Sequence, residues 1–487
     1  MAKVDSNLQD DACIDALLAM QQKHVLLIGD IMLDCYVDGV VSRISPEAPV
    51  PILNHSVSNH VAGGAANVAH NLANLGMSVS LIGLIGADQA GKQLADELNT
   101  IPQLTSHCLT LDDRPTTRKT RFRAQGQQIL RLDEETTSPL LPGQEQALLD
   151  IIEKQIATKP DIIILSDYAK GCLSHRIVAS VTDMAAKASI AVITDPKSAD
   201  FTKYTGSRLL TPNLKELCAA TGTRLESLDE IVMAANSQIA AAQLDAMLVT
   251  LGSQGMLFVS KNSTIHLPAS AIDVFDVSGA GDTVVALVAA SQTGNTAWET
   301  SIQLANLGAG IVVGKSGTAT VSPGEILAHL PSGNMVYGRD TLSQLCNLRN
   351  SWADDELKIG FTNGCFDLLH PGHIDSLKRS ADLCDKLIVA VNSDKSVKAL
   401  KGQNRPIQSE SKRASILAKL PFVDAVILFD EDTPKTIIDA LTPDILVKGG
   451  DYRAEEVVGY ETVTKNGGIV EIIPLLEGHS TSRLAGI

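Results

Sequence analysis

Short apolar runs, each followed by a stretch with helical periodicity, repeat along the first part of this chain, and several end in an acidic residue or a glycine. An apolar run of this kind is typical of a strand buried on both faces. Strands that alternate with helices predict a mostly parallel sheet covered by helices on both sides. The predicted strands cover residues 24–30, 161–167, 190–194, 207–211 and 246–251. We expect a short helix within residues 1–22, ahead of the sheet.

The same alternation starts again near residue 357, after the first pattern decays beyond Gly317. A polar, irregular stretch at residues 331–350 separates the two patterns and is typical of a linker. The predicted strands of the second part cover residues 357–362, 386–391, 424–429, 444–447 and 468–474. A chain of 487 residues is also too long for one compact domain. The sequence therefore predicts two α/β domains, residues 1–330 and 351–487, joined by the linker.

Composition and charge exclude several classes of protein. The net charge is −16 and aromatic residues make up 3% of the chain, so neither a general nucleic-acid surface nor a base-stacking platform is expected. No apolar run approaches the ~20 residues that span a bilayer. The eight cysteines are scattered without metal-type spacing, and the polar N-terminus does not resemble a signal peptide. We expect a cytoplasmic protein that acts on small molecules and binds neither nucleic acid nor membrane.

Two segments of the first domain depart from the strand–helix alternation. Residues 37–57 alternate in polarity and contain three prolines, which suits an edge strand or a flap. Residues 114–123 carry five basic side chains, and alternation places Arg121 and Arg123 on one face. A solvated hairpin is the usual reason for such a run. A phosphate group already present on the substrate is the sharper reason, because guanidinium groups match phosphate oxygens.

Candidate sugar-binding residues lie at the end of the first strand and just beyond it. Asp30 ends this strand and Asp34 lies four positions later, and ligands of open α/β sheets bind beyond the carboxyl ends of the strands. Both carboxylates are candidates for hydrogen bonds to sugar hydroxyls, with a cap or a solvated turn as the alternative. Gly63 and Gly64, followed by Asn67, open a helix of small residues. The double glycine lets a ligand approach the backbone, or else allows tight packing of helix on sheet.

Residues 276–283, with the sequence Asp-Val-Ser-Gly-Ala-Gly-Asp-Thr, lead into an apolar helical pattern. Gly279, Ala280 and Gly281 at a helix start let backbone N–H groups approach an anion. A carboxylate beside a bound phosphate is repelled unless it has a role there. The role that fits Asp282 is to accept a proton from a sugar hydroxyl as that oxygen attacks a nucleotide's terminal phosphate. A glycine-rich turn with an aspartate near a helix start is the alternative.

Asn213 and Glu216 lie three residues apart at the first turn of a predicted helix, so they share a face directed at the strand ends. An amide and a carboxylate in that place could hold Mg²⁺ through water. A glutamate that only stabilises the helix N-terminus is the alternative.

Five motifs in register resemble the ribokinase-like (PfkB) family of sugar kinases. They are Gly63-Gly64, Gly86-x-Asp88-x-x-Gly91, Asn213-x-x-Glu216, Thr250-Leu-Gly252-x-x-Gly255 and residues 276–283. The resemblance implies an α/β domain whose β-stranded lid, residues 37–57 and the basic hairpin, covers the sugar. It also implies that Asp282 is the general base and that residues 279–281 form an anion hole. For ATP and Mg²⁺ it implies a site that includes Asn213, Glu216, Gly252, Gly255 and, near the adenine, Asn306.

In the second domain a predicted strand runs into Asn-Gly-Cys-Phe-Asp-Leu-Leu-His-Pro-Gly-His, residues 363–373. The Pro-Gly between His370 and His373 places both imidazoles at the turn that opens a helix. Neutral or cationic imidazoles there can donate to nucleotide phosphates as negative charge builds in the transition state. Zinc ligation is the alternative, but no Cys/His pair elsewhere completes a set of four ligands.

Two further stretches of this domain are candidates for binding substrate or phosphate. Lys401 ends the motif Lys398-x-x-Lys401-Gly402. Near the end of the chain, three hydroxyls and one arginine occupy a predicted helix start, as a phosphate cradle or as an ordinary N-cap. These residues are Ser480, Thr481, Ser482 and Arg483.

The pair of histidines together with the hydroxyl run resembles the cytidylyltransferase-like nucleotidyltransferases, which implies a smaller Rossmann-like fold for residues 355–487. The terminal motif of that family usually begins with an apolar residue, whereas His479 stands there in this chain.

The fusion of the two halves, with the flap Arg-Ile-Ser-Pro-Glu-Ala-Pro-Val-Pro at residues 43–51, resembles the bifunctional heptose 7-phosphate kinases/heptose 1-phosphate adenylyltransferases of Gram-negative bacteria. The resemblance implies ATP at both sites, phosphorylation of D-glycero-β-D-manno-heptose 7-phosphate at O-1, and adenylyl transfer that gives ADP-heptose for lipopolysaccharide synthesis. A separate phosphatase must act between the two steps, because the first product is a 1,7-bisphosphate and the chain carries no phosphatase motif. We also expect a homodimer formed through the first domain.

Residue chemistry alone reaches a sugar or sugar-phosphate kinase and a nucleotidyltransferase. It leaves open another sugar kinase fused to a CTP-dependent alcohol-phosphate cytidylyltransferase, because spacing fixes neither the sugar nor the nucleotide. A scaffold that kept both folds is a further alternative. Against it stand five intact candidate residues, Asp282, Asn213, Glu216, His370 and His373.

Overall fold

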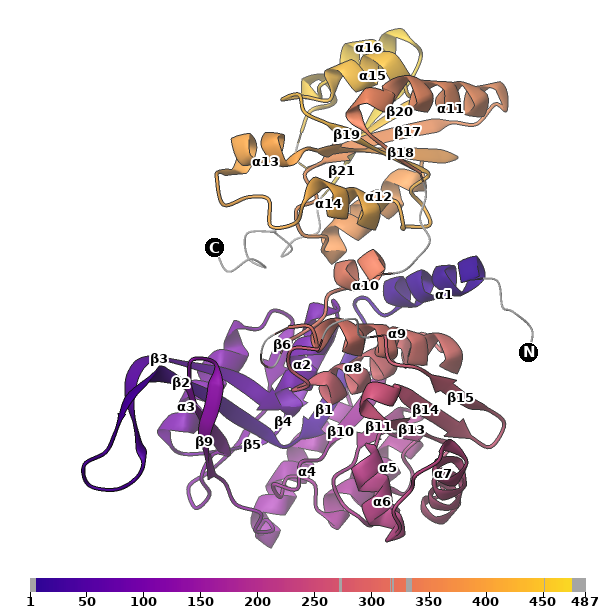
Figure 1. Ribbon diagram of the computed structural model, residues 1–487. Helices are drawn as coiled ribbons and strands as arrows, with labels where there is room; N and C mark the ends of the chain where they lie inside the picture. Colours follow the sequence, from indigo (N-terminus) through magenta and orange to yellow (C-terminus); the bar gives the residue numbers. More distant parts are fainter. Residues whose placement is uncertain are drawn as a thin grey trace. The chain divides into compact units, whose positions relative to one another are not determined.

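The computed structural model of this chain describes residues 6–270, 274–315, 317, 319–329, 335–450 and 452–474 (Figure 1). The chain divides into two compact units, one of Ala16–Ser322 and one of Met1–Asp15 with Pro323–Ile487. Helix α1 (Ser6–Ala19) spans this division. Among the described residues, no helix has the length and apolar character needed to cross a membrane.

The first unit is built on a nine-stranded sheet with the order β15-β14-β13-β12-β11-β10-β1-β4-β6. Its strands are β1 (His24–Gly29), β4 (Ser78–Ile82), β6 (Leu104–Ser106), β10 (Ile162–Ser166), β11 (Ala191–Asp195), β12 (Leu209–Leu210), β13 (Ala246–Thr250), β14 (Met256–Ser260) and β15 (Thr264–Leu267). From β13 to β6 neighbouring strands are parallel, which confirms the predicted fold class. The apolar pattern did not predict β14 and β15, an antiparallel hairpin at one edge.

Helices cover both faces of this sheet (Figure 1). They are α2 (Ala65–Asn74), α3 (Gln89–Thr100), α4 (Pro142–Ile156), α5 (His175–Ala188), α6 (Leu214–Thr221), α7 (Leu228–Ala242), α8 (Ala280–Gln292) and α9 (Trp298–Val312). On one face α4, α5 and α7 pack apolar side chains such as Ile152, Val181 and Ile239 into a core with Leu26 of β1. On the other face α2, α8 and α9 lie together. Burial of these apolar faces supplies the main driving force for folding.

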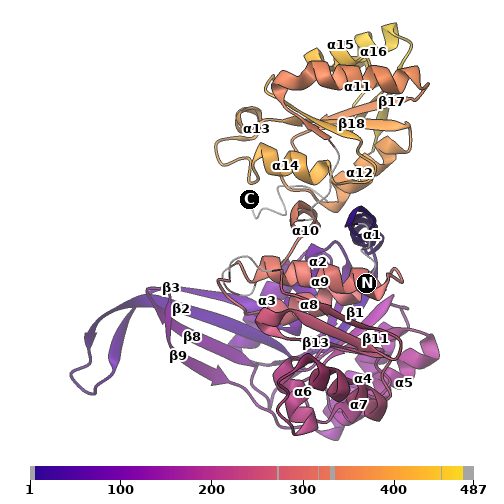
Figure 2. The ribbon, with the colours of Figure 1, turned by 45° about the vertical axis from the view of Figure 1, so that its right-hand side comes forward.

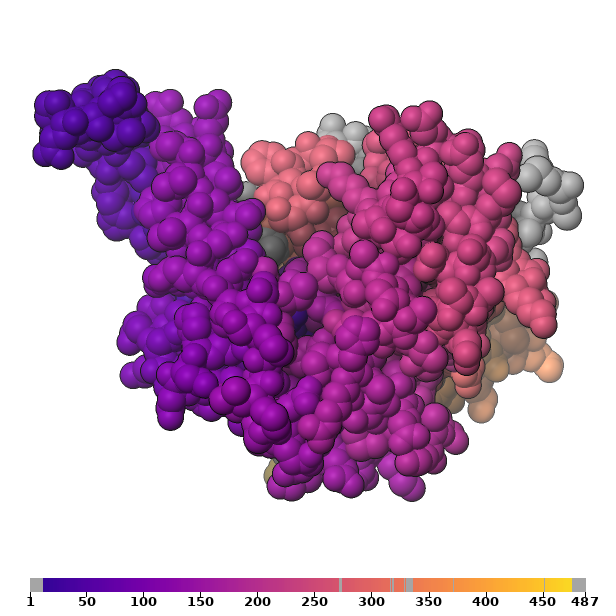
Figure 3. Space-filling model, turned by 90° about the horizontal axis from the view of Figure 1, so that it is seen from below, coloured from indigo at the N-terminus to yellow at the C-terminus, as the bar shows by residue number. Residues whose placement is uncertain are grey.

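A four-stranded sheet projects from this unit as a lid, as predicted, in the order β3-β2-β8-β9 (Figure 2). Its strands are β2 (Ile31–Ile44), β3 (Pro51–Gly64), β8 (Arg118–Ala124) and β9 (Gln127–Glu134), and a small separate sheet pairs β5 (Leu84–Gly86) with β7 (Leu109–Leu111). Only Asp30 separates β1 from β2, and β3 runs directly into α2. Strands β2 and β3 therefore join the body without a loop, while the far end of the lid, drawn in indigo, stands clear of the body in Figure 3.

The second unit is a six-stranded parallel sheet in the order β16-β19-β18-β17-β20-β21. Its strands are β16 (Met335–Tyr337), β17 (Ile359–Gly364), β18 (Lys386–Asn392), β19 (Ala425–Phe429), β20 (Ile445–Gly449) and β21 (Ile469–Ile473). Its helices are α10 (Pro323–His329), α11 (Leu342–Asp354), α12 (Pro371–Ala381), α13 (Asp394–Lys401), α14 (Glu410–Leu417), α15 (Lys435–Leu441) and α16 (Tyr460–Lys465). All five strands predicted for this part of the chain are present.

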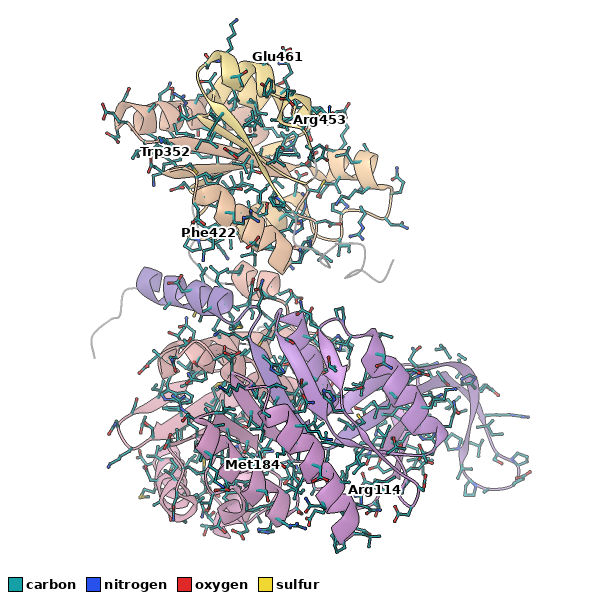
Figure 4. The ribbon with its side chains drawn as sticks, turned by 180° about the vertical axis from the view of Figure 1, so that it is seen from behind. Arg114, Met184, Trp352, Phe422, Arg453 and Glu461 are labelled. Atoms are coloured by element: carbon teal, nitrogen blue, oxygen red, sulfur yellow. The ribbon has the colours of Figure 1, made fainter. Side chains whose placement is uncertain are left out.

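The structure corrects the linker predicted at residues 331–350. Strand β16 pairs with β19, and α11 buries Leu345 against the second sheet, with Trp352 packed beside it (Figure 4). Helix α10 also belongs to this unit, so the division falls after Ser322 rather than at 330. A three-residue strand offers too few alternating positions for its period to be recognised, and the helix that follows it has a largely polar surface.

Candidate active sites

The helix α8, whose N-terminus lies near the ends of β10 and β11, begins at Ala280 after the N-cap Gly279. Gly279 has a φ of 80°, a conformation that costs a residue with a Cβ, and no side chain caps the helix. A Cβ added to Gly281 would meet nothing within 4 Å. The start of α8 thus offers uncapped N–H groups and room beside them, as an anion site requires.

Asp282, in the first turn of α8, is buried and receives two hydrogen bonds from distant segments. The amide Nδ2 of Asn67 donates to Oδ2 at 2.6 Å, and the hydroxyl of Tyr168 donates to Oδ1. Burial raises the pKa of Asp282 to about 6, although both hydrogen bonds lower it. A carboxylate with this pKa is ionised at neutral pH and is a better proton acceptor than an exposed aspartate. The role of Asp282 as general base stays a prediction, and these contacts leave the carboxylate able to accept a proton.

Asn67 and the double glycine were candidates for sugar binding, and the structure gives them other contacts. The side-chain amide of Asn67 donates its hydrogen bond to Asp282. A Cβ on Gly63 would lie 2.2 Å from Oδ2 of Asp34, and one on Gly64 would lie 2.5 Å from the carbonyl oxygen of Asp30. Gly64 also has a φ of 60°. Close packing at the base of the lid therefore explains both glycines, which was the alternative to a ligand contact.

Asp30 is corrected from a sugar-binding residue to a residue that builds a loop. Its Oδ2 accepts from the backbone N–H groups of Tyr168 and Lys170, at 2.9 and 3.0 Å, and its Oδ1 accepts from that of Cys172 at 3.0 Å. Only 3% of the residue is exposed. The strand-end position predicted a carboxylate at the site, but it could not show that backbone donors from the loop after β10 would occupy both oxygens.

The basic residues of the lid are paired with carboxylates of the neighbouring strand. Arg121 donates to Oδ1 of Asp34, and Arg123 makes two hydrogen bonds to Asp38, at 2.8 and 2.7 Å. Both guanidinium groups lie near the ring of Tyr36. Cross-strand pairing thus accounts for these charges in the absence of a phosphate. Asp34, whose negative charge also acts on Asp282, remains at the predicted sugar site.

Asn213 and Glu216 form a reciprocal cap at the start of α6. Asn213 Oδ1 accepts from the backbone N–H of Glu216, and Glu216 Oε2 accepts from that of Asn213, both at 2.9 Å. The other oxygen of Glu216 accepts from Lys197 Nζ at 2.8 Å. The pKa of Asp195 lies well above its usual value because of burial and the nearby charges of Asp282 and Glu216. The helix-start role, which was the alternative to a magnesium site, is observed, and the magnesium site stays a prediction. The carboxylates grouped here are ones that a cation would stabilise.

The other residues predicted for the nucleotide site are divided between open and packed positions. Gly252 has a φ of 61° and open space beside it, whereas a Cβ on Gly255 would lie 2.0 Å from the carbonyl oxygen of Leu267. Asn306 Nδ2 donates to the carbonyl of Pro268 and to the hydroxyl of Ser270, both at 2.8 Å. Gly255 and Asn306 therefore shape the segment around β15, and only Gly252 borders open space.

In the second unit the two predicted histidines come together at the start of α12. The rings of His370 and His373 are stacked with centroids 3.7 Å apart, and Phe366 lies edge-on to His373 at 5.3 Å. Burial and the neighbouring His370 and Lys401 lower the pKa of His373 to about 3. Of the two protonation states left open by the sequence, His373 therefore takes the neutral one. Among the described residues, no three His, Cys, Asp or Glu side chains form a group that could hold a metal ion.

Two lysines extend this site, and only one was predicted. Lys401, at the end of α13, and Lys448, at the end of β20, both act on the thiol of Cys365. Lys448 Nζ donates to Asn363 Oδ1 at 3.1 Å, and burial lowers its pKa. Within the described ranges neither lysine has a carboxylate partner, whereas nearby Arg413 is paired with Asp394. Uncompensated positive charge at this sheet edge suits a phosphate ligand.

The remaining predicted residues, Ser480, Thr481, Ser482 and Arg483, lie outside the described residues. Two residues that the structure brings into the sites, Tyr168 and Lys448, were missed. Tyr168 lies two residues after the end of β10, and Lys448 is the penultimate residue of β20. Both are close to the carboxyl end of a strand, so the strand-end rule that selected Asp30 could have selected them too.

The comparisons with known proteins agree with this division of the chain. Residues 22–324 match the pfkB family of carbohydrate kinases, and residues 361–482 match the cytidylyltransferase-like family. The "Bifunctional protein HldE" of Rhodopseudomonas palustris strain BisB18 is 45% identical over 475 residues, which cover 96% of this chain and 97% of that one. The protein of the same name from Hyphomonas neptunium is 44% identical over 95% and 96%.

Solved structures are similar to the first unit in fold. Phosphofructokinase-2 from Escherichia coli, in complex with substrates and products, covers 64% of this chain and 100% of its own, with a TM-score of 0.54 and 21% identity. Ribokinase from Arabidopsis thaliana, complexed with ribose and ATP, covers 64% and 99%, with a TM-score of 0.51 and 20% identity. The ribokinase-like fold with its lid is thereby confirmed.

Proposed function

Because this chain belongs to the HldE family of bifunctional proteins, we propose that its first unit uses ATP to phosphorylate D-glycero-β-D-manno-heptose 7-phosphate at O-1. The second unit transfers AMP from ATP to heptose 1-phosphate and releases pyrophosphate. The product, ADP-heptose, serves the inner core of lipopolysaccharide. A CTP-dependent cytidylyltransferase is not favoured, because relatives that align over nearly the whole chain carry one shared name.

In the first unit Asp282 takes the proton from O-1 while that oxygen forms its bond to the γ-phosphorus of ATP and ADP leaves. The uncapped start of α8, residues 279–281, stabilises the negative charge of the transferred group. Asp34 binds the sugar. Arg123 binds the 7-phosphate. Its two hydrogen bonds to Asp38 are replaced by hydrogen bonds to two phosphate oxygens, which present the same paired acceptors.

The residues beside α6 fit a magnesium ion that arrives with ATP. The raised pKa of Asp195, caused in part by Asp282 and Glu216, marks a place where negative charge is in excess. Both oxygens of Glu216 already accept hydrogen bonds, so this side chain would hold the ion through water. Bound there, Mg²⁺ would neutralise part of the phosphate charge.

In the second unit His370 and the neutral His373 donate to the phosphates of ATP as the bond between the α- and β-phosphates breaks. Lys401 and Lys448 bind the anionic oxygens of the reactants. Ser480, Thr481, Ser482 and Arg483 complete the phosphate site. The sugar phosphate attacks directly, so no covalent enzyme intermediate is required.

A separate phosphatase removes the 7-phosphate between the two reactions, since the kinase product carries two phosphates and the transferase substrate one. The chain also forms a homodimer through its lid. The exposed apolar side chains of lid strands support this arrangement, and they are Val40, Ile44, Val57, Ile129, Leu130 and Leu132. A neighbour in fold, phosphofructokinase-2, has a tetrameric form.

The buried Asp282 at the uncapped start of α8 is the observation that carries the kinase assignment. The test measures ADP and pyrophosphate release separately, with ATP or CTP, for two full-length variants. Asp282→Asn should lose sugar phosphorylation by ~10²–10⁴ and keep pyrophosphate release, and His373→Ala should do the reverse. An Asp282→Asn variant that retains a tenth of the wild-type kcat would refute the assignment. Pyrophosphate release with CTP but not ATP would refute the adenylyl transfer.

A further inference from the structure

Tyr168 is the one side chain other than Asn67 that donates a hydrogen bond to the Asp282 carboxylate among the described residues. Burial and the charges of Asp282, Asp195 and Asp34 hold the pKa of Tyr168 well above its usual value. The phenol therefore stays protonated at any pH at which the enzyme works. It acts on the carboxylate as a hydrogen-bond donor and cannot compete with it as a base.

The loop that carries Tyr168 is fixed by two buried aspartates. Asp30 accepts from three of its backbone N–H groups, including that of Tyr168 at 2.9 Å. Asp167 accepts from the N–H of Ala169 at 2.8 Å and from the hydroxyl of Tyr204 at 2.7 Å. Ala169 has a φ of 55°, which is uncommon for a residue with a side chain. These hydrogen bonds and the backbone conformation of Ala169 hold the loop in one arrangement, and so they fix the position of Tyr168.

The carboxylate of Asp282 keeps capacity for a substrate while Tyr168 is bound. An ionised carboxylate offers about four acceptor positions on its two oxygens. Asn67 uses one on Oδ2 and Tyr168 uses one on Oδ1. A sugar hydroxyl can therefore donate to Asp282 without displacing either partner.

We propose that Tyr168 is a positioning residue of the kinase reaction, which orients the Asp282 carboxylate and stays hydrogen-bonded to it throughout. The inference rests on the proposed role of Asp282 as general base. In the reaction the sugar O–H bond breaks and its proton passes to Asp282, the sugar oxygen bonds to the γ-phosphorus, and ADP departs. Asp282 afterwards releases the proton to solvent. Tyr168 itself is neither protonated nor deprotonated.

A pH dependence follows from this arrangement. The charged groups that act on Asp282 are Asp34 from β2, which Arg121 partly neutralises, and Asp195 from the end of β11. The donors are Asn67 from α2 and Tyr168. Loss of the phenol hydroxyl removes a bond that favours the ionised carboxylate, so the pKa of the base should rise. The acidic limb of the pH–rate profile should move to higher pH.

The experiment compares Tyr168→Phe with wild type in kinase assays from pH 5 to pH 9, following both kcat and kcat/KM. Ser291→Ala is the control, because it removes a buried hydroxyl at the other end of α8 that donates to the carbonyl of Val288 and not to Asp282. In Tyr168→Phe we expect the acidic limb of both profiles to shift to higher pH by about one unit, which is the effect of losing one hydrogen bond to a charged group. In the control the limb should stay in place. Urea unfolding followed by the fluorescence of Trp298, in a Trp352→Phe background, shows that the first unit of each variant is folded.

A Tyr168→Phe profile that is lowered equally at every pH would overturn the proposal, because it would mean that the ring only packs. A shift confined to kcat/KM would also overturn it, since the hydroxyl would then leave the base once the sugar binds. If Tyr168→Phe is too slow for a profile, ¹³C NMR titration of the aspartate carboxyls in the free protein gives the same comparison. Failure of the base assignment is recognised separately, by an active Asp282→Asn variant.

Discussion

Replacement of Asp30 with asparagine should destabilise the first unit and leave sugar affinity unchanged. The asparagine oxygen can keep the two backbone bonds from Tyr168 and Lys170, now at 2.9 and 3.0 Å. Its NH₂ group would then face the N–H of Cys172, a donor, and that bond is lost. The substitution therefore removes one buried acceptor and the negative charge that strengthens the other two bonds.

The expected loss in the free energy of unfolding follows from the hydrogen bonds and the charge that the substitution removes. A buried N–H left without an acceptor costs ~1–3 kcal/mol, and the remaining bonds lose the strength that the charge gives them. Burial raises the pKa of Asp30, so removal of the charge also relieves a desolvation cost. We expect the free energy of unfolding of the first unit to fall by ~2 kcal/mol, the middle of this range.

The two tryptophans of the chain make the measurement possible, because Trp298 lies in the first unit and Trp352 in the second. In a Trp352→Phe background, fluorescence of Trp298, which contacts Phe258, follows urea unfolding of the first unit alone. Asp161→Asn is the control: this exposed carboxylate accepts from the N–H of His24 at the opposite end of β1, and its loss should cost under ~1 kcal/mol. An unchanged Asp30→Asn midpoint with a several-fold higher KM for the sugar phosphate would show that Asp30 binds sugar and that the structural reasoning is wrong.

Four further outcomes are expected. Kinase kcat/KM should fall tenfold per pH unit below about pH 6, where Asp282 takes up a proton, and a profile flat to pH 5 in steady-state assays would contradict this. Lys448→Met should raise the transferase KM for ATP or sugar 1-phosphate by ~10-fold or more, with Lys448→Arg less affected and ADP release by the kinase unchanged. Arg123→Ala should raise KM for a phosphorylated sugar only, and an equal rise for an unphosphorylated sugar would leave Arg123 as a partner of Asp38 alone. Leu130→Glu should convert the dimer into a monomer in sedimentation experiments, and an unchanged mass would exclude the exposed lid face as the interface.

The sequence predicted the parts of the molecule that rest on local patterns. Apolar runs located the parallel strands, and the glycine-rich segment located Asp282 at a helix start. It could not predict which partner each polar group would choose when several compete. Asp30 and Asp34 stand in similar positions after β1, yet one binds backbone N–H groups and the other Arg121.

Long-range partners caused most of the errors. Asn67 and Asp282 are separated by more than 200 residues, and their hydrogen bond depends on how α2 and α8 pack on one face of the sheet. Strand β16 was missed for a different reason. Its three residues can be recognised as a strand only through their pairing with β19, which lies far along the chain. In both cases tertiary structure decides between local alternatives that are equally acceptable.

The direct junctions of β1 with β2 and of β3 with α2 have a mechanical consequence. A lid attached through loops alone would swing as a rigid flap on a hinge. Here β2 and β3 are held firmly at their root, so their displacement should increase steadily with distance from Asp30 and Gly64 and be greatest around residues 45–50. Deuterium uptake along β2 and β3 should follow that gradient, and insertions should be tolerated at the tip but not at the root.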